Sequence, residues 1–270
     1  MNAHKPSFRT LHQQYIKRTK KTTHIIWSIQ LAILVLFFAG WELASTQRWI
    51  DPLLFSSPSK IYTLFISNTQ DGSLFPHVSV TIIETLVSFI IATILGTFIA
   101  CMLWWFPMLS RIFDPYLVTL NAMPKVALGP IIIVIFGPNI SSSIAMGVII
   151  SIIITIIVIY NAFTNVDANY IKVLQTFRST KRQVFTEAVF PSSFSAIIST
   201  LKVNVGLSWV GVIVGEFLVS KEGLGYLINY GFQIFNFNLV LMSVLLIMVV
   251  AACMYVLVDA LEKIIIRNDK

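Results

Sequence analysis

The sequence predicts an all-α membrane protein with six transmembrane helices. Of its 270 residues, 56% are hydrophobic and only 11% are charged, and the mean hydropathy is +0.82. A soluble domain of this length could not bury so much apolar surface. Continuous apolar runs of about 20 residues, enough to cross ~30 Å of hydrocarbon, indicate helices and not the short alternating segments of a β-barrel. The six runs are approximately 25–44, 80–105, 117–136, 143–160, 194–218 and 239–262.

The amino-terminal tail, residues 1–24, is basic. It holds six Lys and Arg residues and no acid, so the positive-inside rule predicts that this end stays in the cytoplasm. Six spans then return the short tail 263–270 to the same side. On this topology the inside segments carry 14 basic residues and the outside segments carry three, Arg48, Lys60 and Lys221. This asymmetry accounts for the net charge of +7, so we expect no nucleic-acid partner.

The first apolar run, 25–44, is expected to be an uncleaved transmembrane helix. It is longer than the roughly 7 to 15 residues of a signal-peptide core, and no small-residue cleavage pattern follows it. The external segment 45–79 comes next. It contains Pro52 and Pro58, and a helix lying in the membrane plane is expected over Ser59–Ile66. Such a segment suits the docking of an extracytoplasmic partner.

The membrane core, residues 80–262, is predicted to hold the other five spans. Its second run, 117–136, contains Pro124 and Pro130, which remove backbone donors, so we expect this helix to be kinked or opened where it lines a cavity. Lys125 lies between the two prolines. An isolated ammonium is costly inside a bilayer, so it must face protein, water or headgroups. It either attracts an anionic or polar solute or extends its charge to the inner interface, and we favour the second.

The run 194–218 carries two charged residues. Glu216 lies near its outer end, where it contacts solute, gates a cavity or docks an external protein, or else is an interfacial carboxylate that caps a helix or pairs with Lys221. Lys202 lies toward the inner end and is expected to anchor at the headgroups. Two small-residue patterns predict close helix packing, within the chain more than between copies: Gly211 with Gly215, and Ala92 with Gly96 and Ala100.

A polar interruption, Asn161–Ser192, separates two apolar runs and carries four basic residues. Apolar side chains recur at helical spacing twice within it, and Pro191 follows the second set. The pattern predicts a hairpin over 168–190, with two short amphipathic helices joined at Arg178-Ser179-Thr180 and the second ended by Pro191. Held at the membrane face, such a hairpin can transmit force from a soluble partner. The face expected on its first helix comprises Tyr170, Val173, Leu174 and Phe177.

The sequence holds no motif for catalysis or nucleotide binding. It lacks GxxxxGK[ST], HExxH and GxSxG, and it has no cluster of His, Cys and carboxylates that indicates a metal site. Cys101 and Cys253 both fall within predicted spans, where we expect them to pack. Any chemical energy must therefore come from another subunit or from an ion gradient.

Four segments in the right order carry a family resemblance that covers about 57–261. The most specific is Leu207–Ile228, which includes Glu216 and a Gly-Leu-Gly-Tyr stretch. The others are Met123–Gly137, Leu74–Ser88 and the hairpin. The chain resembles the integral membrane permease subunits of binding-protein-dependent ABC importers, in particular the nitrate, sulfonate and taurine type.

The hairpin departs from that family's pattern at two positions. The family signature runs Glu-Ala-Ala, then Gly, then a closing Pro, whereas this chain has Lys172 in place of the acid and Arg178 in place of the Gly. A left-handed Arg costs on the order of 1 kcal/mol, so either Arg178 adopts that strained turn or the turn is built differently. By resemblance, an ATP-binding subunit docks here, and its contact residues are Lys172, Val173, Leu174, Phe177, Arg178 and Pro191.

The resemblance implies the MetI-like fold of a type I ABC importer permease, in a bacterial plasma membrane with both termini cytoplasmic. It implies an ATP-binding subunit that binds ATP and Mg, an extracytoplasmic solute-binding protein, and a second copy of this chain as partners. This chain itself is then not an enzyme and holds no cofactor. Pro124, Lys125 and Glu216 are candidates for lining or gating the pathway. The implied solute is small and anionic or aromatic, such as a sulfonate, nitrate, taurine or a vitamin precursor.

Two other classes of function are open at this point. A gradient-driven secondary transporter or channel subunit needs no hairpin, and it ordinarily requires a relay of buried titratable residues, of which the sequence offers few. A membrane-embedded enzyme requires a catalytic constellation, which the sequence does not contain.

Overall fold

The computed structural model describes residues 8–267, without the side chains of 8–14, 16–18 and 265–267. All regular elements in this part of the chain are helices, which confirms the predicted all-α class. The tails predicted at 1–24 and 263–270 lie partly outside the described residues. The chain divides into two compact units, residues 1–63 and 64–270.

The first unit contains the long helix α1 (Phe8–Thr46), and α2 (Pro58–Gln70) begins in it. Residues Thr19–Thr46 of α1 are long and apolar enough to cross a membrane. The Glu42 carboxylate accepts hydrogen bonds from the Ser59 backbone N–H at 2.9 Å and from its hydroxyl at 2.8 Å. A carboxylate at a helix start satisfies free amides and suits the helix dipole. The first turn of α2 is therefore fixed by a side chain of α1.

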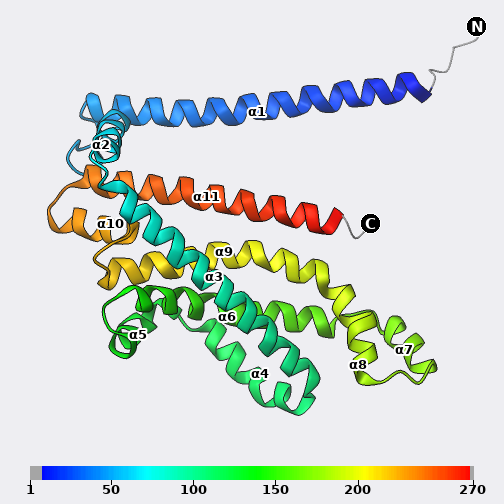
Figure 1. Cartoon of the computed structure of the whole chain (residues 1–270). Coiled ribbons are helices and arrows are strands. Elements are labelled where there is room, and N and C mark those ends of the chain that lie inside the picture. The colour runs from blue at the N-terminus through cyan, green and yellow to red at the C-terminus, as the bar shows by residue number, and fades with distance from the viewer. Residues whose placement is uncertain (1–7, 268–270) are drawn as a thin grey trace, which may run out of the picture. The chain divides into compact units, whose positions relative to one another are not determined.

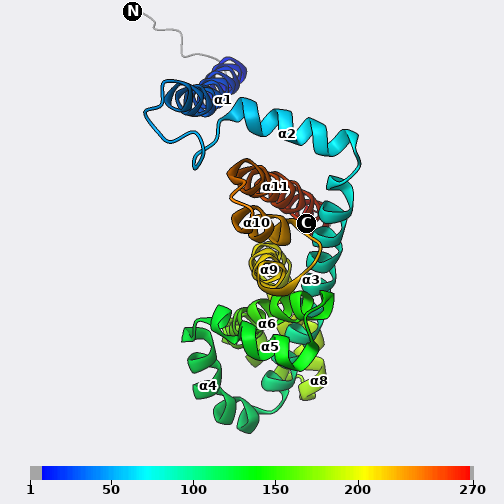
Figure 2. The ribbon, with the colours of Figure 1, turned by 90° about the vertical axis from the view of Figure 1, so that its left-hand side faces the viewer.

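The second unit is a bundle of long helices with short helices at its ends (Figures 1 and 2). A 3₁₀ turn, η1 (Lys125–Leu128), and a π-helix, η2 (Phe185–Val189), interrupt the α-helices. The α-helices are α3 (Leu74–Trp105), α4 (Pro107–Ala122), α5 (Gly129–Phe136), α6 (Ile140–Thr164), α7 (Ala168–Thr176), α8 (Lys181–Val184), α9 (Phe190–Val219), α10 (Leu224–Gln233) and α11 (Phe237–Arg267).

Five helices of the described chain are long and apolar enough to span a membrane, and α4 with η1 and α5 makes a sixth candidate that is bent by 95°. The expected kink is thus confirmed at Pro124, whereas Pro130 lies in the first turn of α5. This candidate begins at Pro107, earlier than the predicted 117. The apolar pattern missed the start of the helix because Arg111 and Asp114 lie inside α4 and interrupt the pattern.

The centre of the bundle is a close contact among α3, α6 and α9. A Cβ on Gly211 would lie 2.5 Å from the Gly147 Cα, and a Cβ on Gly215 would lie 2.5 Å from the Ser143 Cα. A Cβ on Gly96 would lie 2.6 Å from a methyl carbon of Thr155. The two small-residue patterns therefore bring helices together within the chain, as expected.

Hydrogen bonds between side chains join the same three helices at membrane depth. The Thr155 hydroxyl donates to the Asn204 carbonyl oxygen at 2.9 Å, and the Asn204 amide donates to the Thr93 hydroxyl at 3.0 Å. Ser151 and Ser208 bond each other at 3.0 Å. These polar groups satisfy one another where neither water nor lipid could do so.

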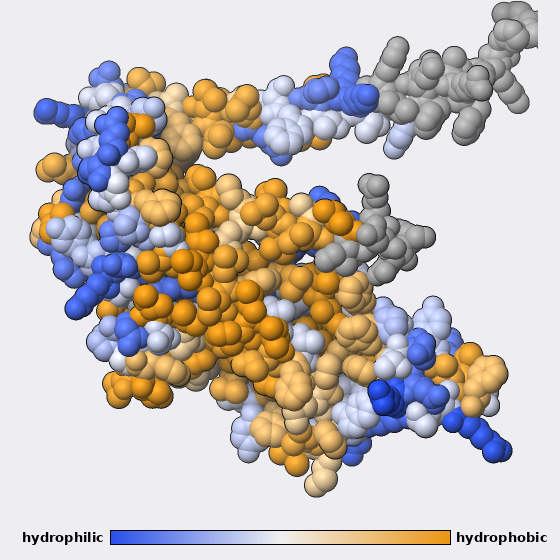
Figure 3. All heavy atoms as spheres, viewed as in Figure 1, coloured by the Kyte–Doolittle hydropathy of each residue, from blue (hydrophilic) through white to orange (hydrophobic). Residues whose placement is uncertain are grey.

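Short helices occupy the two ends of the second unit (Figure 1). The carboxyl-terminal part of α11 lies at the same end as α7 and α8, and α10 lies at the other. In Figure 3 hydrophobic residues cover the middle of the bundle, and hydrophilic residues gather around α7 and α8. We call the first the hairpin end (α7, α8) and the second the α10 end (the turn 220–223 and α10).

Candidate functional site

The hairpin end is built by strong local signals. The Asp167 carboxylate accepts from the Asn169 N–H at 2.8 Å and starts α7. At the other end of α7, the Arg178 N–H donates to the Gln175 carbonyl at 2.9 Å and the Ser179 N–H donates to the Leu174 carbonyl at 3.2 Å. This is a Schellman turn, and Arg178 takes its left-handed position with φ 54°. Of the two alternatives, the strained turn is the one observed.

The second helix of the hairpin is confirmed, but its predicted end is wrong. α8 starts with a reciprocal capping box between Thr180 and Gln183. It then runs through η2 into α9, so Pro191 lies in the first turn of a long helix and does not stop one. The physical reason is the π-helical turn, in which the Phe190 N–H bonds the Phe185 carbonyl. This wider turn accommodates a residue that has no N–H and carries a ring.

The apolar face predicted on α7 splits into two parts. Tyr170, Val173 and Phe177 are 59%, 56% and 77% exposed, whereas Leu174 is half-buried against a core cluster that includes Ile159. Lys172 and Arg178 are exposed beside them. The described hairpin therefore presents three apolar side chains flanked by two cations. In a membrane protein such a surface at a polar end suits a protein partner or headgroups.

The hairpin is tied to α3 by a residue that the sequence analysis did not single out. The Lys181 ammonium donates to the Trp105 carbonyl at the carboxyl end of α3. It also lies 5.4 Å from the ring centroid of Trp104 and 5.7 Å from that of Trp105. The Phe185 ring packs on Trp104 with centroids 4.9 Å apart. A cation at a helix carboxyl end and over two indoles is favourable on both counts, so α8 and α3 are held together here.

The break between α4 and α5 contains Pro124 and Lys125. Met123 is extended, as expected for a residue that precedes proline. Lys125 is half-buried, and its ammonium donates to the Asn121 carbonyl at 3.1 Å. Beside the break, a groove between η1, α5 and α9 has an entirely apolar lining of Val126, Ala127, Pro130, Ile213, Val214, Phe217 and Leu218.

Glu216 is fully buried and helps to fix the start of α10. Its carboxylate accepts from the Gly225 N–H at 2.7 Å. The Thr81 hydroxyl accepts from the Leu224 N–H at 2.8 Å, and the His77 Nδ1 accepts from the Gly223 N–H at 3.1 Å. Three successive amides at this helix start are thus satisfied by side chains of α3 and α9.

Sequence reasoning missed Glu84, the partner of Glu216. Glu84 on α3 is 1% exposed, and its carboxyl group faces that of Glu216. A carboxylate inside an apolar run was the available signal, since ionisable groups at membrane depth are rare and usually functional. What the sequence could not give is the contact, because the two residues lie on different helices.

The structure gives Lys202 two partners that the sequence analysis did not name. Its ammonium forms salt bridges with Asp259 and, at 2.7 Å, with Glu262 on α11. The candidate site residues therefore fall in three places: the docking residues at the hairpin end, Pro124 and Lys125 at the break, and Glu216 at the α10 end. The structure does not bring the last three together.

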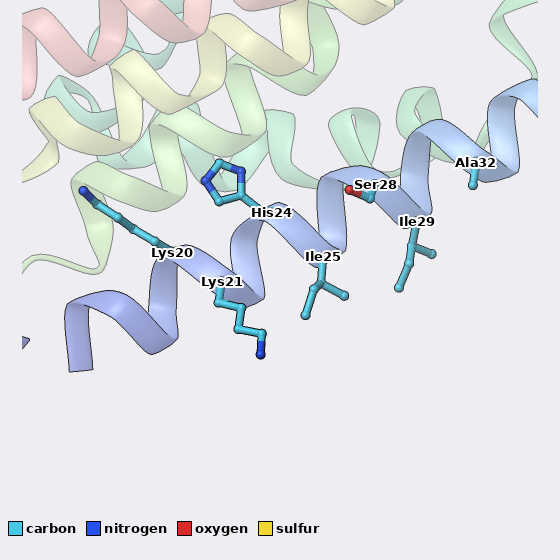
Figure 4. Close-up of a pocket in the computed structure, with 7 residues that line it drawn as sticks. All are labelled: Lys20, Lys21, His24, Ile25, Ser28, Ile29 and Ala32. Carbon is cyan, nitrogen blue, oxygen red and sulfur yellow. The ribbon is translucent and has the colours of Figure 1, made fainter. Parts of the chain in front are cut away.

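A shallow surface pocket on α1 carries no site. Its lining residues, Lys20, Lys21, His24, Ile25, Ser28, Ile29 and Ala32, all belong to one helix, and Figure 4 shows their side chains spread along it without a common centre. Elsewhere in the described residues, no three His, Cys, Asp or Glu side chains are grouped so as to hold a metal ion.

Comparison with known proteins gives a consistent result. The family model of the binding-protein-dependent transport system inner membrane component matches residues 92–267. The formylaminopyrimidine transport permease protein ThiX of Halalkalibacterium halodurans is 28% identical over 186 residues, or 69% of this chain and 74% of that protein. The putative aliphatic sulfonates transport permease protein SsuC of Bacillus subtilis is 23% identical over 241 residues, or 89% of this chain and 87% of that protein.

A solved structure shares the fold. It is titled as an inward facing conformation of the MetNI methionine ABC transporter, and it superposes with a TM-score of 0.62 at 16% sequence identity. The match covers 73% of this chain and 96% of the other. This likeness confirms the predicted MetI-like fold.

Proposed function

We propose a function that starts from the family, since this chain belongs to the binding-protein-dependent transport system inner membrane components. It is a multi-pass membrane protein and a permease subunit of an ABC importer. We propose in addition that an ATP-binding subunit docks on the hairpin end and drives solute transport through this chain. ATP and Mg then bind to that partner and not to this chain.

One observation carries the docking proposal, namely the exposed apolar surface of the hairpin. Tyr170, Val173 and Phe177 are more than half exposed at a polar end of the molecule, and Lys172 and Arg178 flank them. Aromatic anchors within a charged rim are typical of protein interfaces. The Lys181 contact then joins the docked surface to α3. The hairpin would act as a two-state coupling element for alternating access.

The other proposed partners follow from the family to which the chain belongs. A second copy of this chain would complete the pathway, and the broken helix at Pro124 and Lys125 would line it. A solute-binding protein would dock at the α10 end, with the hairpin in the cytoplasm. We propose that both termini are cytoplasmic too, as the distribution of basic residues predicts. The relatives are named for a formylaminopyrimidine and for aliphatic sulfonates. We propose a solute of the same kind, small and either anionic or aromatic.

The docking proposal is tested by changing one exposed residue. In membranes that contain the ATP-binding subunit, Phe177→Asp should reduce its co-purification with this chain at least tenfold and abolish coupled ATP hydrolysis. Gln175→Asp is the matched control, because it adds the same charge to α7 on the opposite side of the helix. Equal recovery of the ATP-binding subunit with wild type and Phe177→Asp would refute hairpin docking.

The alternative function, a gradient-driven transporter or channel subunit, differs from an ABC importer in its energy source, so an uptake assay can distinguish the two. The solute used is the ligand of the binding protein that co-purifies with the chain. Uptake into vesicles that depends on ATP after ionophores have collapsed all ion gradients supports the importer. Uptake that stops with the gradients and ignores ATP supports the alternative.

A further inference from the structure

Glu84 and Glu216 form an enclosed pair between α3 and α9 near the start of α10. They are 1% and 0% exposed. A Cβ on Gly223 would lie 2.3 Å from the Glu216 carboxyl carbon, and a Cβ on Gly225 would lie 2.8 Å from the Glu216 Cβ. The backbone of residues 223–225 therefore packs directly against the Glu216 side chain.

The surroundings of the pair offer no compensating positive charge. In the described part of the chain, no Lys, Arg or His makes a salt bridge with Glu84 or Glu216. The groups that face Glu216 are the Gly225 N–H and the Thr81 hydroxyl, and Ser143 on α6 faces Glu84.

Titratable groups occur nearby, but they are otherwise engaged or exposed. His77 on α3 accepts from the Gly223 N–H through Nδ1 and faces Glu222. Lys221 and Glu222 in the turn are exposed. Tyr226 on α10 stacks on the His77 ring. None of these groups neutralises a second carboxylate, and two adjacent ionised carboxylates in apolar surroundings are strongly unfavourable.

The hydrogen bonds favour one of the two carboxyl groups as the site of a proton. Glu216 accepts a backbone N–H, and such a bond stabilises the ionised form of a carboxyl group. Both oxygens of Glu84 are buried, and neither has a donor among the described hydrogen bonds. We propose that the pair holds one proton, carried by Glu84 as a carboxylic acid whose O–H donates to the Glu216 carboxylate. The ligand of this site is a proton.

The proton has a structural consequence at the α10 end. It keeps Glu216 beside Glu84 and thereby keeps the acceptor of the Gly225 N–H in place. Together with the Thr81 and His77 bonds, it attaches the start of α10 to α3. Loss of the proton at high pH would leave two like charges in contact, so the attachment should weaken as pH rises.

Infrared spectroscopy of the purified chain in lipid nanodiscs tests the assignment. At neutral pH the wild type should show the C=O band of a buried protonated carboxylic acid, and Glu84→Gln should remove it while keeping the size and hydrogen-bonding ability of the side chain. Asp114→Asn is the matched control, because Asp114 on α4 is exposed, and it should leave the band unchanged. Identical bands in wild type and Glu84→Gln would overturn the proposal.

A second measurement holds even if Glu84→Gln folds poorly. On alkaline titration of the wild type, the acid band and the thermal midpoint should fall together. A midpoint that instead depends on Na⁺ or Ca²⁺, lowered by their removal at constant pH, would mean that a cation and not a proton separates the carboxylates. That result would also overturn the proposal.

Discussion

The hairpin and the start of α10 lie at opposite ends of the second unit and are built differently. At the hairpin end, apolar side chains are exposed and the turn contains a strained Arg178. At the α10 end, the first amides of the helix are bonded to side chains of other helices and two carboxyl groups are enclosed. The hairpin surface is the one we propose to be covered by an ATP-binding subunit, whereas the polar groups at the start of α10 are bonded within the chain. Substitutions of exposed hairpin residues should therefore reduce binding of the proposed ATP-binding subunit. Substitutions of the buried residues at the start of α10 should reduce the stability of the chain.

The largest expected effect is the loss of Glu216. Glu216→Ala should lower the free energy of unfolding by about 3 kcal/mol, because it leaves the Gly225 N–H unsatisfied and opens a buried cavity. Thermal unfolding in detergent measures the change. Glu222→Ala, in the exposed part of the same turn, is the control and should have little effect. Equal midpoints for the two variants would mean that the α10 end does not depend on its enclosed carboxylate.

Leu174 and Phe177 lie close together on the hairpin, but one is half-buried and the other is exposed. Leu174→Asp should destabilise the chain by about 2 kcal/mol, because a charge replaces a half-buried side chain that packs on the core. Phe177→Asp should leave the free energy of unfolding within about 0.5 kcal/mol of wild type, because the ring is 77% exposed. Similar destabilisation by both variants would show that the exposed face is structural.

Lys181 joins the hairpin end to the bundle. Its replacement should have little effect on the stability of the chain but a larger effect on the coupling of transport to ATP hydrolysis. Lys181→Met should cost about 1 kcal/mol or less, since a partly exposed cation–π contact and one hydrogen bond are lost. Transport per ATP hydrolysed should nevertheless fall several-fold. Arg182→Met, at the neighbouring exposed position, should preserve this ratio. A normal ratio in Lys181→Met would exclude the α3 contact as the route of coupling.

The smallest effect concerns the turn of the hairpin. Arg178→Gly should raise stability by about 0.5 to 1 kcal/mol, because glycine adopts φ 54° without strain. Arg182→Gly should lower stability by a similar amount, because position 182 is helical. Opposite shifts in the thermal midpoint are expected from the same chemical change. Shifts of the same sign would contradict the strained turn.

Local patterns were enough to predict much of this structure. The hairpin turn, the helix over Ser59–Ile66 and the kink at Pro124 each depend on residues that are close in sequence. Two local predictions were wrong. The start of α4 was not predicted because charged residues interrupt the apolar pattern in its first half, and the helix does not end at Pro191 because the π-helical turn of η2 accommodates the proline.

Contacts between helices were beyond the reach of sequence patterns. The partner of Lys202 lies on α11, and the partner of Glu216 lies on α3. A single charge in an apolar run signals that some partner is needed, but the pattern does not say which helix supplies it. Glu84 was a visible signal of this kind. Its meaning depends on the packing of α3 against α9.

One helix connects the two contrasting ends. α3 is continuous for 32 residues, about 48 Å at 1.5 Å per residue. It meets Lys181 of the hairpin at its carboxyl end, and near its amino end it carries His77, Thr81 and Glu84. A continuous helix joins these two sets of contacts, with no loop between them. A tilt of α3 as a rigid body would therefore displace the hairpin contact and the start of α10 in one step.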